Sequence, residues 1–98
     1  MRLSEQEIDA IRRSFRETFE SGMLYLFGSR VDDRRRGGDI DLYIVPDRYE
    51  NVARKKIAFL AELKRRIGEQ KIDVVIGRGQ ARPIDRAAEK DGVLLWSA

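Results

Sequence analysis

The spacing of apolar residues changes along the chain, and each spacing predicts one kind of element. From Ser4 to Gly22, apolar residues recur about every three or four positions, which predicts a helix. Ser4 and Glu7 have the spacing of a capping box at its start. A second such pattern follows Pro46, with Asp47 and Glu50 as a further capping pair and Gly68 as its C-terminal cap. The inward positions predicted for this long helix are Val52, Ile57, Leu60, Leu63 and Ile67.

Short apolar or alternating runs predict strands at residues 23–27, 39–45, 71–76 and 93–96. A short helix is predicted from Pro83 to Ala88. The expected order is α-β-β-α-β-α-β, an α+β fold in which helices pack against one small mixed sheet. Neither repeats nor a linker interrupt the pattern, so residues 1–98 are expected to form a single domain.

Composition excludes several classes of chemistry. The chain has neither cysteine nor histidine, so disulfides, thiolate zinc sites and a Ser-His-Asp triad are ruled out. Acid–base work then falls to carboxylates or to a metal. Twenty basic and 17 acidic residues give a net charge of +3, too mild to indicate nucleic-acid binding alone. No run approaches the ~20 apolar residues of a membrane span, and the polar start lacks a signal-peptide core, so we expect a cytoplasmic protein.

Three aspartates occupy positions where strands seldom carry them. Asp39 and Asp41 are two apart on one predicted strand and therefore share a face. Asp73 lies inside another predicted strand, where burial of an unpaired carboxylate is costly. A divalent cation would turn the repulsion among converging carboxylates into attraction, and magnesium prefers such oxygen ligands. A structural ion pair with a buried arginine is the alternative for Asp73.

Gly28 and Ser29 follow the first predicted strand directly. Glycine allows the backbone to approach a ligand closely, and free N–H groups at the start of a helical turn attract anions. Ser29 adds a hydroxyl donor, and Arg30 offers a charge that can steady a phosphate, although a surface position suits it as well. A phosphate cradle beside a metal site is what phosphoryl or nucleotidyl transfer requires.

At these residues the chain resembles a known family. Phe27-Gly28-Ser29-Arg30, Asp39-Ile40-Asp41-Leu42 and Ile72-Asp73-Val74-Val75 look like the three-part motif of the DNA polymerase beta superfamily of nucleotidyltransferases, and nearly the whole chain is similar to its minimal, stand-alone (MNT) branch. The resemblance implies the nucleotidyltransferase fold. It also implies that Gly28 and Ser29 contact the triphosphate and that Asp39 and Asp41 bind one or two Mg²⁺ ions. Asp73 would complete the metal site and assist deprotonation of an acceptor hydroxyl.

The resemblance also implies a partner. Many MNT proteins act as antitoxins of helical HEPN-domain proteins, some by transferring AMP from ATP onto a tyrosine hydroxyl of the partner. In this chain nine residues separate Ser29 from Asp39, one fewer than in the common form of the motif. That difference favours a second hypothesis, a catalytically silent module that neutralises a helical partner by occlusion. Both leave room for a homo- or hetero-oligomer.

Two further alternatives concern single features. Arg34, Arg35 and Arg36 form a basic run that is usually solvated but would also suit RNA, a weaker third hypothesis. Tyr43 shares the strand face of Asp41, where it either stacks on a nucleotide base or packs in the core. The basic residues of the long helix, Arg66 among them, are expected on its solvated face.

Overall fold

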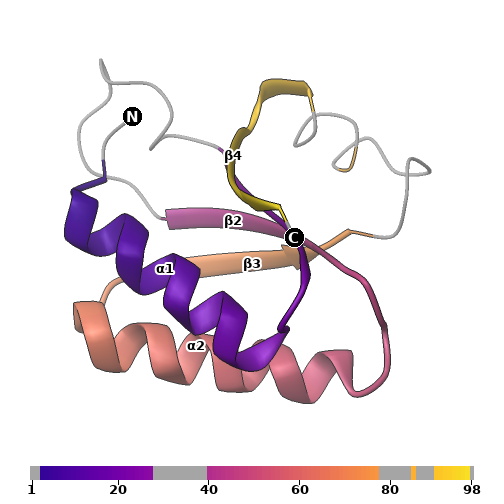
Figure 1. Cartoon of the computed structure of the whole chain (residues 1–98). Helices are drawn as coiled ribbons and strands as arrows, with labels where there is room; N and C mark the ends of the chain where they lie inside the picture. Colours follow the sequence, from indigo (N-terminus) through magenta and orange to yellow (C-terminus); the bar gives the residue numbers. More distant parts are fainter. Residues whose placement is uncertain (1–2, 28–39, 78–84, 86–89, 98) are drawn as a thin grey trace.

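The computed structural model describes residues 3–27, 40–77, 85 and 90–97. Its elements run in the order α1, β1, β2, α2, β3, β4 (Figure 1). The predicted α+β class is confirmed, and the predicted order holds apart from the short helix before the last strand. That helix, residues 83–88, lies mostly outside the described residues, although Asp85 within it and Lys90 and Asp91 after it are helical. The bounds are α1 Glu5–Thr18, β1 Gly22–Phe27, β2 Ile40–Pro46, α2 Val52–Ile67, β3 Ile72–Ile76 and β4 Val93–Ser97.

The four strands form one mixed sheet in the order β3-β2-β1-β4. β1 is antiparallel to both β2 and β4, whereas β2 and β3 are parallel and are joined through α2. β3 and β4 are the two edge strands, although they follow each other among the described elements.

The start of α1 is as predicted, and its end is not. The Ser4 hydroxyl accepts a hydrogen bond from the Glu7 amide, and the Glu7 carboxylate accepts one from the Ser4 amide, each at 3.1 Å. The helix ends at Thr18 rather than at Ser21-Gly22. Gly22 instead opens β1 with a φ of 130°, at a point where a Cβ would lie 2.4 Å from the Val45 carbonyl oxygen. The glycine therefore serves the close pairing of β1 with β2.

Helix α2 differs from the prediction at its start and on its inner face. The prediction that Asp47 and Glu50 cap this helix is wrong. The N-cap is Asn51, whose backbone is in the left-handed region and whose side chain makes no capping hydrogen bond. Ile57 is 70% exposed, whereas Phe59 is fully buried. Ile57 lies roughly 100° around the helix from the centre of the apolar stripe, so its side chain faces solvent. The predicted cap at Gly68 is confirmed.

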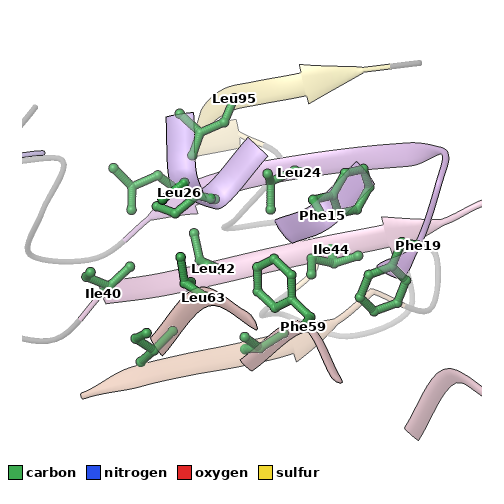
Figure 2. Packing of buried hydrophobic residues seen from close by; sticks show 14 residues of the cluster. Phe15, Phe19, Leu24, Leu26, Ile40, Leu42, Ile44, Phe59, Leu63 and Leu95 are labelled. Atoms are coloured by element: carbon green, nitrogen blue, oxygen red, sulfur yellow. The ribbon is translucent and has the colours of Figure 1, made fainter. Parts of the chain in front are cut away.

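The main core lies between the sheet and the two helices, which cover the same face of it (Figure 2). Aromatic rings join the helices, since Phe19 stacks on Phe15 at 5.6 Å and meets Phe59 edge-on at 6.1 Å between ring centroids. The strands contribute every second residue to this core. Its fully buried members are Ile11, Phe15, Leu24, Leu26, Ile40, Leu42, Ile44, Phe59 and Leu63.

Arg66 links α2 to α1, which corrects its expected place on a solvated face. Its guanidinium donates to the Ser14 hydroxyl at 2.9 Å and to the Glu17 carboxylate at 2.6 Å. The Arg66 side chain is only 19% exposed, and Ser14 is fully buried. A charged pair this well hydrogen-bonded fixes how the two helices pack.

Candidate active site

The face of the sheet opposite the helices carries the described aspartates of the motif. On β2, Ile40, Leu42 and Ile44 belong to the helix-covered core. Side chains alternate along a strand, so Asp41 points to the opposite face. The same alternation on β3 places Asp73 on that face, which we call the carboxylate face.

Strand register brings the two carboxylates together. Asp41 and Asp73 are directly paired in the parallel ladder of β2 and β3, and Phe27 is paired with Asp41 from β1. Neighbouring strands lie about 4.8 Å apart, so these three residues form one row across the sheet. Asp41 and Asp73 are 32 positions apart in sequence and are adjacent in the sheet, as the prediction of converging carboxylates requires of this pair. We call Phe27, Asp41 and Asp73 the carboxylate row.

The row is open to solvent on the side of Asp73. Asp73 is exposed, and Asp41 and Phe27 are partly buried. The expected cost of burying Asp73 therefore does not arise. The alternative of a structural ion pair for Asp73 has no support among the described residues, where no arginine or lysine pairs with it. An exposed carboxylate directly opposite another is instead available for a cation.

The remaining predicted site residues are Gly28, Ser29, Arg30 and Asp39, which lie outside the described residues. Phe27, the residue before Gly28, and Ile40, the residue after Asp39, both stand at this end of the sheet. Within the described ranges no group of three carboxylates is close enough to hold a metal. Asp41 and Asp73 are the two described carboxylates that fit one, because they supply hard oxygen ligands from adjacent strands.

Tyr25 and Tyr43 form a second row beside the carboxylate row, and this row is buried rather than open to solvent. Tyr43 follows Asp41 by two residues on the same face and is fully buried, and Tyr25 beside it on β1 is 9% exposed. Their ring centroids are 5.9 Å apart. The prediction that Tyr43 packs in the core is confirmed, and stacking on a base is wrong because its ring has no exposed face.

The Tyr43 hydroxyl donates a hydrogen bond to the carboxylate of Asp85 at 2.7 Å. Asp85 is fully buried and lies between β3 and β4 in the chain, 42 residues from Tyr43. Sequence reasoning missed this aspartate, because a single acidic residue in a polar stretch carries no periodic or motif signal. A buried carboxylate is stable only when hydrogen bonds or charges satisfy it, and Tyr43 contributes one such bond.

Gly77, the residue that follows β3, packs closely against Tyr43. The Gly77 amide donates to the Ile44 carbonyl at 2.7 Å, and the Tyr49 hydroxyl donates to the Gly77 carbonyl. A Cβ added at Gly77 would lie 2.5 Å from the Tyr43 hydroxyl oxygen. Only glycine fits there without displacing the Tyr43 ring.

These features define a small α+β domain with helices on one face of a mixed sheet and paired carboxylates on the other. The sequence profile described as "Polymerase beta, Nucleotidyltransferase" matches residues 9–98. The chain therefore belongs to the polymerase beta-type nucleotidyltransferase family. Membership supports nucleotidyl transfer as its class of activity, with a nucleotide as substrate and a divalent metal as the usual cofactor of the family.

A search of curated proteins finds no relative that matches the chain. Among the described residues, neither α1 nor α2 has the length and apolar character needed to cross a membrane.

Proposed function

We propose that the chain is a magnesium-dependent nucleotidyltransferase that transfers a nucleoside monophosphate, AMP from ATP, onto an acceptor hydroxyl and releases pyrophosphate. The observation that carries this proposal is the direct pairing of Asp41 with Asp73 on the open face of the sheet. Two carboxylates facing each other repel, and a protein that keeps them there gains most when a divalent cation binds between them. Family membership supplies the class of reaction.

The proposed roles follow the three parts of the motif. Asp39, Asp41 and Asp73 hold one or two Mg²⁺ ions. The bound metal supplies charge neutralisation on the phosphates during in-line displacement. Asp73 is the most exposed described member of the row, and it accepts the proton of the incoming hydroxyl. Gly28 and Ser29 donate hydrogen bonds to the triphosphate, and Arg30 steadies its charge.

The proposed acceptor is a tyrosine hydroxyl on a HEPN-type partner, with the chain as the antitoxin of a cytoplasmic toxin–antitoxin pair. The support for this step is the resemblance to the MNT branch. In this proposal the partner brings its own hydroxyl to Asp73, which makes a hetero-oligomer the active form.

Label transfer from α-labelled ATP tests the proposal directly. The protein is incubated with Mg²⁺, alone and with any co-encoded partner, and Asp39→Ala serves as the inactive control. The expected result is label on the partner, lost with EDTA and lost in Asp39→Ala while the variant stays folded. Absence of label with all four nucleotides, from a folded protein with its partner bound, would overturn enzymatic transfer.

The second candidate is a silent module that neutralises a helical partner by occlusion. The observation that favours it is the spacing of nine residues between Ser29 and Asp39, one fewer than in the common form of the motif. The two candidates differ in what Asp39→Ala does to a cell that makes the toxin. Under the transfer hypothesis the variant fails to protect the cell, and under occlusion it protects as well as the natural chain.

A further inference from the structure

One basic residue lies next to the carboxylate row, and the proposed chemistry assigns it no role. The strands β1, β2, β3 and β4 contain neither lysine nor arginine. Of the residues that directly flank these strands in sequence, Lys71, immediately before β3, is the only basic one. Its side chain is exposed. Lys71 is therefore the one positive charge that the strands and their immediate neighbours bring to the sheet.

The backbone places the Lys71 side chain on the carboxylate face. The Lys71 carbonyl accepts a hydrogen bond from the Ile40 amide at 3.0 Å, so Lys71 continues the parallel ladder of β2 and β3 by one residue. The residue before it, Gln70, donates from its side chain to a carboxylate of α1 at 3.2 Å. The residue after it, Ile72, belongs to the helix-covered core. Because both neighbours point to the helix side, alternation directs Lys71 to the opposite face.

Along the strands, the carboxylate row has a closed side and an open side. Tyr43 is one step from Asp41 on the same face and is fully buried. Lys71 is one step from Asp73 in the opposite direction and is exposed. A step of two residues along a parallel strand is about 6.6 Å. A ligand bound at Asp41 and Asp73 can therefore extend toward Lys71 and not across Tyr43.

Charge balance gives a triphosphate a reason to extend this way. A triphosphate carries more negative charge than a single Mg²⁺ offsets, and Asp41 and Asp73 already share the charge of that ion. The phosphate oxygens therefore need a further cation. Lysine supplies a compact positive charge on a flexible four-carbon stem, and charge-assisted hydrogen bonds to phosphate are among the strong ones.

We propose that Lys71 is a substrate-binding residue, whose ammonium contacts the phosphates of the nucleoside triphosphate held at Asp41 and Asp73. The inference rests on the proposed function, since it takes that nucleotide as the ligand of the carboxylate row. Asp73 and Lys71, two residues apart on one face, then act on the same ligand, the first through the metal ion and the second directly.

Equilibrium binding of a nucleotide analogue tests this role. The probe is the magnesium complex of an ATP analogue that is non-hydrolysable between the α and β phosphates. Lys71→Gln removes the charge and keeps a polar side chain, and it is expected to raise the Kd roughly tenfold. Lys71→Arg keeps the charge, and its Kd is expected to stay within about threefold of the natural value. Calorimetric titration of the folded proteins measures these values.

Lys64→Gln is the matched control. It makes the same change in net charge on α2, which lies on the helix-covered side of the sheet. Surface charges farther apart than a Debye length are largely screened, so its Kd is expected to stay within about twofold of the natural value. Should Lys71→Gln fail to fold, Lys71→Met, which keeps the aliphatic stem, replaces it with the same expected increase in Kd.

An unchanged Kd in folded Lys71→Gln would identify an ordinary solvated lysine and overturn the contact. A Lys71→Arg Kd as high as that of Lys71→Gln, or an equal effect of Lys64→Gln, would also overturn it. The contact further predicts that added salt narrows the difference in Kd between Lys71→Gln and the natural chain. A difference that persists undiminished at high salt indicates a structural effect instead and contradicts the proposal.

The same titrations separate this inference from the proposed function. A natural chain that binds the analogue but transfers nothing refutes the transferase alone, and the Kd series still decides the role of Lys71. A natural chain that binds none of the four nucleotide analogues overturns both.

Discussion

The helix-covered face of the sheet and the carboxylate face are built on the same four strands, but different forces set their residues. On the helix-covered face, Leu24, Leu42 and Phe59 are fully buried, and their identity follows from the apolar area they remove from water. On the carboxylate face Asp41 is partly buried and Asp73 is exposed, so removal of apolar area from water does not set the identity of these two paired residues. The first face is apolar throughout, whereas the second joins a buried pair of tyrosines to a solvent-accessible pair of carboxylates.

The largest effect expected on this comparison comes from Phe59→Ala. Phe59 is fully buried and meets Phe19, so its truncation leaves a cavity and is expected to cost about 3–5 kcal/mol of unfolding free energy. Urea denaturation measures the change. Ile57→Ala, on the same helix but 70% exposed, is the matched control and should change stability little. Equal effects of the two substitutions would mean that α2 is not packed as described.

The opposite pattern is expected for Asp73→Asn on the carboxylate face. Asp73 is exposed, so the free energy of unfolding should change by no more than about 0.5 kcal/mol. Transfer should fall by about 100-fold or more, because an amide cannot replace the charge at the metal or accept the proton. Parallel denaturation and label-transfer assays test both halves. Glu69→Gln, which removes an exposed carboxylate from the turn before β3, is expected to leave both values unchanged.

The smallest difference in stability is expected between substitutions of two adjacent arginines of α2. Arg66→Gln breaks the bonds to Ser14 and Glu17 and is expected to cost about 1–3 kcal/mol. Arg65→Gln removes only an exposed pair with Glu62 and should have no effect that survives high salt. Denaturation midpoints of the two variants at low and high salt make the comparison.

The contribution of the Arg65–Glu62 ion pair to stability should depend on pH in a definite direction. A hydrogen bond from Arg65 lowers the pKa of the Glu62 carboxyl. The contribution of the pair is therefore present above the ordinary pKa of glutamate and is lost as the pH falls through the lowered value. Denaturation midpoints measured from neutral pH into this acidic range should converge for the natural chain and Arg65→Gln. A difference that grows on acidification would contradict the assigned direction.

Sequence patterns predicted the elements of the fold because apolar residues recur at the positions that each helix or strand buries. The errors occurred where local pattern and tertiary contact disagree. Ile57 fits a loose helical spacing, but Phe59 fits the actual centre of the buried stripe. Arg66 looks like any other helical arginine, and only the packing of α1 supplies its partners.

The residues of the candidate site also include some that the sequence predicted and one that it did not. The resemblance to the family motif predicted that Asp41 and Asp73 belong to one site, and the parallel pairing of β2 with β3 places the two residues side by side. Asp85 was beyond prediction, since its partner Tyr43 is 42 residues away and neither belongs to the motif. The roles assigned to Gly28, Ser29, Arg30 and Asp39 stay predictions. They rest on sequence resemblance to the family.

The strand order also governs how the nascent chain reaches its native state. β1 can pair with β2 early in synthesis, but its second edge stays bare until residues 93–97 have left the ribosome. A bare strand edge is a template for pairing with other chains. Synthesis that stalls or terminates before β4 would therefore release a product prone to aggregation and dependent on chaperones.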